Sequence, residues 1–298
     1  MLPVASNEQV PARLRWSLLA LVSLAFVINF LDRQVLSVLA PTIRKELNLS
    51  NSQYGFIVFS FLLGMASFQV PNGLLMDRIG PRWAFTWIVS FWSAASFLHA
   101  AARSVWHFAL LRFALGGAEC GNYTGGLKIV SQRFPVRERA LAAGIFNSCT
   151  FLGSVVAPII VAWLALRFSW RAAFMIASTT GFIWLIPWRL IYPKTLDEAT
   201  RKQPEGAGAA PPVSVKQLLE FRQTWGLILM RSLTGPLSHF YWFWLPEYFS
   251  SARGLSLAEI GRVVWIPYVF IGLGNVTGGL WAGWLLKRGV SLDVGRRV

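Results

Sequence analysis

The sequence predicts an all-α polytopic membrane protein, a helical bundle with a first half of six spans and a partial second half. Of its 298 residues, 55% are hydrophobic and only 14% are charged, and the mean hydropathy is +0.50. A water-soluble domain has about 25% charged residues, because its surface must be solvated. The apolar residues also stand in runs of about 18 or more, the length that crosses a bilayer as a helix. Much of the surface is therefore expected to face lipid.

The apolar runs predict eight spans, with short links except after the sixth. Their approximate bounds are 16–40, 53–76, 83–102, 105–131, 140–166, 170–192, 224–249 and 262–286. Pro and Gly mark the longer polar stretch as irregular chain, and Ser214 and Gln217 at its end form a capping-box pattern that predicts a short amphipathic helix. We therefore expect a six-helix first half at 1–192, a cytoplasmic linker at 193–222 and a partial second half at 223–298.

The net charge of +15 lies mainly in the links between spans. Of the 28 Lys and Arg residues, 17 fall on the side that holds both termini and the linker, seven on the opposite side and four within spans. Positive residues concentrate on the cytoplasmic side of membrane proteins, so both termini are predicted in the cytoplasm, at a cell membrane of the bacterial inner-membrane type. This bias explains the charge without a nucleic-acid partner, since the basic residues form no continuous face.

The histidines give no indication of an enzyme. His99, His107 and His239 lack metal-ligand spacing, and no nucleophile–base pair stands out. We therefore expect no catalytic residue, no metal and no cofactor, and a monomeric protein embedded in the lipid bilayer.

Asp32 and Arg33 interrupt the first apolar run. A charge at the centre of a membrane helix costs about 2.5–3.5 kcal/mol on insertion scales, so such residues normally face a partner or a cavity. Two interpretations are open. The two residues form a local ion pair that fixes helix packing, or Arg33 offers its planar guanidinium to a substrate carboxylate while Asp32 is free to titrate.

The fourth span carries Arg112 and Glu119 on one face, about two helical turns apart. Either Arg112 neutralises Glu119 permanently, or Glu119 lies away from a fixed cation and carries a proton at neutral pH. Lys128, further along, is expected to extend toward the cytoplasmic interface. Three glycines recur in this span at intervals of four, a small-residue ridge that predicts close packing against another helix. They are Gly117, Gly121 and Gly125.

The link after the second span reads Gly73-Leu-Leu-Met-Asp77-Arg78-Ile-Gly80-Pro-Arg82. By itself it is a short basic turn in which Gly80 and Pro81 end the helix. Its order of Gly, Asp, Arg, Gly and Arg resembles the signature loop of the major facilitator superfamily, and two halves joined by a linker agree with a common transporter plan. The resemblance implies a major-facilitator-type bundle in which this loop is a conformational latch for one alternating-access state.

Other stretches are similar to the anion:cation symporter family and its hexuronate-transporter branch. They are Asp32-Arg33, Arg112 with Glu119, Phe146-Asn-Ser148, Thr224 to Arg231, Phe240 to Tyr248, Arg253 to Ser256 and Trp265 to Pro267. The resemblance runs from about residue 16 to 297. It implies proton-coupled uptake of a small organic anion, expected to be a hexuronate or related sugar acid, in which Asp32 and Glu119 handle the proton and Arg33 binds the anion.

The expected substrate-binding set draws on both halves. Its members are Phe30, Arg33, Met65, Arg112, Asn147, Thr150, Trp242 and Trp244. Most of the 15 Trp residues lie near span ends, where an aromatic belt is the usual cause. Trp242 and Trp244 lie within a span instead and are candidates for contact with a ligand.

The chain departs from the family pattern in three places. Phe30 stands where Tyr is common, Gly235 stands where the hexuronate branch tends to have an acid, and only two spans follow the linker. The alternatives are a truncated, transport-inactive protein of the same fold, or a symporter for another carboxylate. Coupling to sodium in place of protons also stays open.

The charge bias yields a testable topology. Reporter fusions at Gly80, Pro135 and Gly208 should report the cytoplasm, and fusions at Asn51 and Ala252 should report the outside, because positive links are retained inside. Paired phosphatase and fluorescent-protein fusions measure this, and a cytoplasmic signal at Asn51 would overturn the span assignment.

Overall fold

The computed structural model describes residues 10–197 and 215–288, and every regular element within these ranges is helical. The first part consists of α1 (Ala12–Leu47), α2 (Asn51–Ile79), α3 (Pro81–Leu98) with the 3-10 turn η1 (His99–Ala101), α4 (Val105–Arg133), α5 (Val136–Arg167) and α6 (Trp170–Ile191). The second part consists of α8 (Val215–Glu220), α9 (Arg222–Arg253), α10 (Leu257–Val263) and α11 (Trp265–Lys287). All eight predicted spans are therefore helical. The short helix predicted before the seventh is α8, although Ser214 lies outside the described residues.

Six helical segments among the described residues are long and apolar enough to cross a membrane. They are α1, α2, α3 with η1, α5, α6 and Leu257–Gly274. The helices α4 and α9, also predicted as spans, have 29 and 32 residues but do not meet this standard. Charged side chains within them, such as Arg112 and Glu119 in α4 and Arg231 in α9, lower their hydropathy, because these two helices carry polar groups into the bundle.

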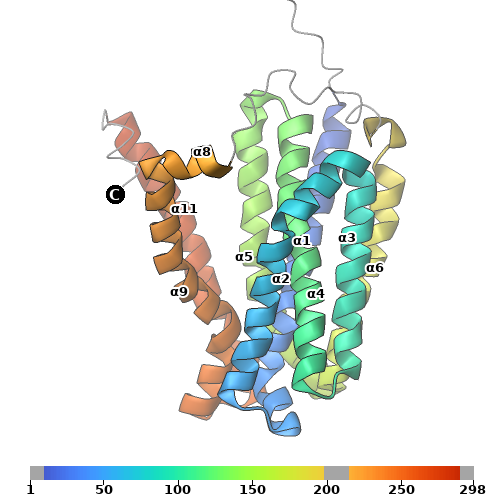
Figure 1. Ribbon diagram of the computed structural model, residues 1–298, viewed down its shortest axis with the longest axis vertical. Helices are drawn as coiled ribbons and strands as arrows, with labels where there is room; N and C mark the ends of the chain where they lie inside the picture. Colours follow the sequence, from blue (N-terminus) through green and yellow to red (C-terminus); the bar gives the residue numbers. More distant parts are fainter. Residues whose placement is uncertain (1–9, 198–214, 289–298) are drawn as a thin grey trace, which may run out of the picture.

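The helices begin differently at the two ends of the molecule. At the end that we call the far end, serine side chains cap the N-termini of α2, α4, α6 and α10 by accepting a hydrogen bond from the backbone. At the opposite end, called the linker end because α8 lies there, Pro81 opens α3 and Pro135 precedes α5 (Figure 1). Proline suits this position because its fixed φ matches the first turn and its missing N–H would have no partner there.

The last predicted span differs from expectation. It was expected as one helix at 262–286, whereas α10 ends at Val263 and α11 begins at Trp265. Pro267 explains the break, because proline lacks an N–H and its ring clashes with the carbonyl four residues earlier, which here belongs to Val263. A capping box between Ser256 and Glu259 starts α10 ahead of the break.

Glycines allow α2 and α4 to lie in near backbone contact. A Cβ at Gly64 of α2 would overlap the backbone carbonyl of Phe113, and a Cβ at Gly116 of α4 would overlap that of Phe61. The sequence interpretation missed this reciprocal contact, since neither glycine belongs to the predicted ridge.

The predicted ridge on α4 packs against two neighbours. A Cβ at Gly121 would lie 2.6 Å from Ile88 of α3, and one at Gly117 would lie 2.9 Å from Phe68 of α2. Gly125 meets Phe85 of α3 in the same way, at 2.6 Å. The packing role predicted for these glycines is therefore confirmed, and it places α4 deep within the bundle.

The helices α9 and α11 meet the first six helices at the far end and lean away from them toward the linker end (Figure 1). All residues from Trp225 to Thr234 are exposed, whereas Gly235 is buried. Contact between the two parts is thus concentrated in the far-end half of α9.

Replacing Gly116 by Ala should destabilise the protein. The added methyl group forces α2 and α4 apart, and overpacking of this kind costs about 1–3 kcal/mol, so the melting temperature of the purified protein should fall by roughly 2–10 °C. Gly144→Ala in α5 is the matched control, because a Cβ there meets nothing within 4 Å. Equal melting temperatures for the two variants would contradict the close contact.

Candidate substrate and coupling site

A buried ion pair joins α1 to α4 near the middle of the bundle. Arg33 donates from Nε and Nη2 to one oxygen of Glu119, Oε2, at 3.1 and 3.0 Å. Arg33 is 7% exposed and Glu119 is 1% exposed. Two charges at this depth are tolerable only as partners, since an unpaired ion in apolar surroundings costs several kcal/mol.

This pairing corrects both expectations for Glu119. Arg112 does not neutralise it, and it does not lie away from a fixed cation. Residues seven apart on a helix share a face but are separated by about 10.5 Å along its axis, whereas contacts within a helix form at spacings of three and four. Arg33 reaches Glu119 from the neighbouring helix instead.

The guanidinium of Arg33 lies among aromatic rings. Its central carbon is 4.6 Å from the centre of the Phe30 ring and 5.1 Å from that of Phe61. Asn29 accepts a further, longer hydrogen bond from Nη2 at 3.4 Å. The rings stabilise the cation by cation–π attraction and exclude water around it. Phe30, predicted to bind substrate, therefore lies in direct contact with the predicted anion-binding cation.

Asp32 faces a different helix from its neighbour Arg33. Its Oδ1 accepts a hydrogen bond of 2.9 Å from Ser96 of α3, and Asp32 is fully buried. Consecutive residues on a helix point about 100° apart, so the local Asp32–Arg33 ion pair considered from the sequence does not form. Asp32 is held inside the six-helix part instead.

Arg112 is also fully buried and contacts α1 through the backbone. Its Nη1 donates to the carbonyl oxygen of Arg33 at 3.4 Å, and its guanidinium carbon lies 5.8 Å from the Phe61 ring centre. Several buried atoms around this cluster have no hydrogen-bond partner among the described residues. They are Asp32 Oδ2, Glu119 Oε1, Arg112 Nε and Nη2, and both amide atoms of Asn122. Buried polar atoms are normally satisfied, so such a concentration marks a site where protons or polar ligands act.

The remaining predicted substrate residues occupy different depths. Trp242 of α9 lies edge-on to Phe30, with ring centres 5.8 Å apart, whereas Trp244 lies edge-on to Tyr54 at 5.0 Å. Of the two, Trp242 is therefore the one that reaches the surroundings of Arg33.

On α5, Gly153 lies against Phe30, and Thr150 and Asn147 follow about one and two turns away. Both are half-buried, and Asn147 donates to the carbonyl of Ala143 at 2.8 Å. Met65 on α2 is half-buried against the apolar core. These three residues stay predictions as substrate contacts.

The predicted latch loop links four helices. Asp77 forms an ion pair with Lys128 of α4, which was expected to extend toward the interface and instead joins α4 to α2. Gly80 adopts a φ of 81°, a conformation that favours glycine, and Gly73 lies beside Thr124. Arg78 is exposed.

Arg82 ties the same loop to the segment after α6. Its backbone N–H donates to Asp197 Oδ1 at 3.1 Å, and its Nη2 donates to the carbonyl of Arg189 at 2.9 Å. The sequence interpretation missed Asp197, because an acid within a polar linker has no periodic context to single it out.

Three polar contacts hold the two parts together at the far end. Ser37 donates to the carbonyl of Trp242 at 2.7 Å, and Tyr54 donates to the carbonyl of Phe243 at 2.7 Å. Arg44 and Glu247 form an ion pair. Pro246 explains the first of these, because it lacks the N–H that would bond the carbonyl of Trp242 within the helix. The proline and the acid within α9 were the available sequence signals.

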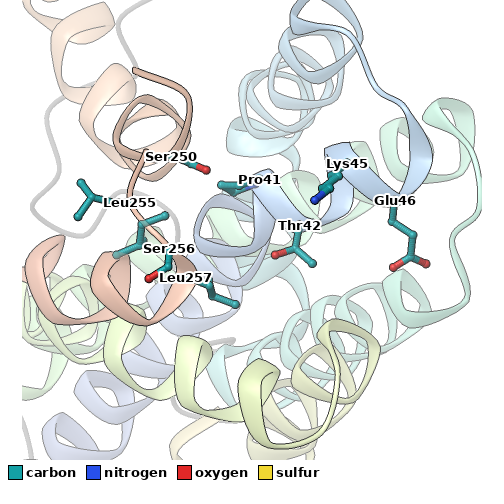
Figure 2. Close-up of a pocket in the computed structure, with 9 residues that line it drawn as sticks. Pro41, Thr42, Lys45, Glu46, Ser250, Leu255, Ser256 and Leu257 are labelled. Carbon is teal, nitrogen blue, oxygen red and sulfur yellow. The ribbon is translucent and has the colours of Figure 1, made fainter. Parts of the chain in front are cut away.

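A surface groove of about 560 Å³ lies beyond these contacts, between the ends of α1 and α9 and the start of α10 (Figure 2). Thr42, Lys45 and Ser256 are among its lining residues, and Lys45 is exposed. Lys45 is about 18 Å from Arg33 along α1, at about 1.5 Å per residue. The groove is therefore separate from the buried ion-pair cluster.

The helical architecture and the latch loop define a transporter class. The family model described as the Major Facilitator Superfamily matches residues 22–298, and the chain belongs to this family of transport proteins, which are not enzymes.

Two relatives with named solutes resemble the chain over most of its length. It is 32% identical to the hexuronate transporter of Escherichia coli K12, over 96% of this chain and 69% of that protein. It is 31% identical to the galacturonate transporter of Dickeya chrysanthemi, over 89% of this chain and 81% of that protein. The predicted resemblance to hexuronate transporters is therefore confirmed.

Solved structures agree on the fold. A bacterial homologue of the human lysosomal transporter Spinster, in an inward-facing and unoccupied conformation, matches with a TM-score of 0.77 at 20% identity, over 94% of this chain and 64% of that one. A D-xylose–proton symporter matches with a TM-score of 0.65 at 16% identity, over 92% of this chain and 69% of that one. The chain thus spans about two thirds of the length of these proteins.

Proposed function

We propose that the protein carries a hexuronate or related sugar acid across the cell membrane together with a proton. The observation that carries this proposal is the Arg33–Glu119 ion pair, in which one carboxylate oxygen takes two nitrogens of the guanidinium. A substrate carboxylate needs the same planar fork, so it competes with Glu119 for Arg33. Named relatives that carry hexuronate and galacturonate support the choice of solute.

Competition for one cation provides a coupling mechanism. When Glu119 takes up a proton, its hold on Arg33 weakens, and the guanidinium becomes available to the substrate anion. When the substrate leaves, Arg33 needs a counter-ion again, and Glu119 releases its proton to provide one. Asp32, buried with an unpartnered Oδ2, is the second acid of the cluster and is proposed as an additional proton carrier.

The other predicted residues complete the site. Phe30 and Trp242 enclose the cation, Arg112 holds α1 through the Arg33 carbonyl, and Met65, Asn147, Thr150 and Trp244 are proposed to contact the solute or shape its compartment. Alternation follows from rocking of the second half (223–298) against the first (1–192), with 193–222 as the linker. The far-end contacts close one side, and the latch residues Gly73, Asp77, Arg78, Gly80 and Arg82 brace the linker end of the first half.

Uptake of labelled galacturonate and glucuronate into membrane vesicles, with and without an inward proton gradient, tests the function directly. Gradient-dependent accumulation supports the proposal, and accumulation that follows a sodium gradient instead would overturn the proton assignment. Both termini are proposed to lie in the cytoplasm of a bacterial-type inner membrane, with the protein acting as a monomer.

Glu119→Gln should separate coupling from binding. The amide keeps an oxygen for Arg33 but cannot lose a proton, so accumulation driven by a pH gradient should disappear while counterflow exchange of labelled galacturonate persists. Glu46→Gln is the matched control, because Glu46 is an exposed acid at the end of the same α1 that carries Arg33. A Glu119→Gln protein that still concentrates substrate would exclude Glu119 as the coupling acid.

Arg33→Lys should weaken sugar-acid binding by about tenfold or more. An ammonium retains the charge but cannot offer a planar fork, and each lost hydrogen bond to a charged group costs about 1.5–3 kcal/mol. Isothermal titration of the purified protein with galacturonate measures this, with Arg103→Lys at an exposed position as the control. Unchanged affinity would assign Arg33 a purely structural role.

A further inference from the structure

His239 is the polar side chain of α9 that lies nearest the rings around Arg33. The preceding stretch from Trp225 to Thr234 is exposed, Gly235 is buried and His239 is half-buried. It therefore stands where α9 first meets the six-helix part, on the wall opposite α1. The interpretation of the sequence found no role for it.

The orientation of the imidazole is set by its own helix. Nδ1 lies 2.7 Å from the carbonyl oxygen of Gly235, and this contact requires Nδ1 to carry the hydrogen. In the neutral ring, Nε2 is then an acceptor on the side away from that carbonyl. It makes no hydrogen bond within the part of the chain that the structure describes.

Two aromatic bridges connect His239 to the cation. Its ring stacks on Phe243 at 6.2 Å with an angle of 19°, and it meets Trp242 edge-on at 5.6 Å. Phe243 in turn contacts Phe61 at 5.6 Å, and Trp242 contacts Phe30 at 5.8 Å. Phe61 and Phe30 are the two rings on which the Arg33 guanidinium lies. Arg33 and His239 therefore face one aromatic-lined region from the two halves of the protein.

There is room beside the imidazole for a ligand group. A Cβ built on Gly235, one turn before His239, meets no atom within 4 Å. The side of α9 toward the linker end thus presents a polar ring nitrogen next to unfilled space, above a floor of apolar rings.

We propose that His239 is a substrate-binding residue of the second half and accepts a hydrogen bond from a hydroxyl of the sugar acid whose carboxylate occupies Arg33. This inference rests on the proposed function and extends it from the carboxylate to the hydroxyl end of the solute. A polyhydroxylated acid has both an anion for a guanidinium and hydroxyls for a neutral imidazole, whereas a simple carboxylate has only the first. His239 then selects sugar acids over other organic anions, since a site built to bond a hydroxyl discriminates against ligands that lack it.

The test measures binding to the purified protein, with galacturonate and cyclohexanecarboxylate as probes. The second probe has a carboxylate on a six-membered ring without hydroxyls. His239→Phe keeps the stacking on Phe243 and removes Nε2, so galacturonate affinity should fall by about threefold to tenfold, the effect of one neutral hydrogen bond, while affinity for cyclohexanecarboxylate stays unchanged. His239→Gln, whose side chain retains a polar end, should recover part of the loss.

His107→Phe is the control, because His107 is exposed at the start of α4. Unchanged galacturonate binding in His239→Phe would overturn the proposal, and so would an equal loss for both probes or a loss that His239→Gln does not relieve, since these mark a packing role. Failure of the unmodified protein to bind galacturonate would reject the proposed function itself, which the variants do not affect.

Discussion

The ion pair between Arg33 and Glu119 is the interaction on which the rest of the site depends. Four ionisable groups, two acids and two arginines, are buried within one region of α1 and α4. Burying them is tolerable because each helix brings one acid and one arginine, and because the helices exchange partners across their contact: Arg33 binds Glu119, and Arg112 binds the α1 backbone. Loss of either partner leaves a buried charge uncompensated, which costs about 3–5 kcal/mol. The cluster therefore fixes the position of α1 against α4 as well as providing the chemistry.

Close packing makes this electrostatic arrangement possible. Gly64 and Gly116 let α2 approach α4 to near backbone contact, and this brings Phe61 under both arginines. An aromatic face attracts a cation while it keeps water away, so the same ring lowers the local dielectric and strengthens the Arg33–Glu119 attraction. The small residues of α4 and the charges of α4 are thus parts of one design, since the charges could not meet their partners if the helices stood further apart.

Much of the fold could be predicted from the sequence, because the signals are local. Runs of apolar residues located all eight long helices, and the glycine ridge of α4 was assigned to packing as observed. The break before Trp265 was missed although Pro267 carries its signal. The charged residues of the site were also recognised, because an ion in an apolar run stands out against its neighbours.

Their pairing could not be predicted in the same way. A sequence shows neighbours along one helix, so Asp32 was weighed against Arg33 and Glu119 against Arg112, but the observed contacts run between helices. Ser96 for Asp32 and Asp197 for Arg82 are ordinary polar residues without any pattern, and only the folded chain brings them to their partners. The far-end contacts depend on backbone carbonyls of Trp242 and Phe243, which no side-chain pattern reports.

Those far-end contacts have the strength that a reversible closure requires. Two neutral hydrogen bonds and one partly exposed ion pair contribute on the order of 1 kcal/mol each, and the aromatic contacts of Trp242, Phe243 and Trp244 add about 0.5–1.5 kcal/mol apiece. Their sum is several kcal/mol, enough to favour closure at the far end. A ligand shifts such an equilibrium only by its differential affinity for the two states, and reversing a ratio of about 100 to 1 takes about 5.5 kcal/mol. Binding that engages Arg33 on one half and α9 on the other lies on the same structural path as the closure, because Phe30 and Trp242 link them. Occupancy of the site and closure of the far end are therefore coupled through a single layer of aromatic rings.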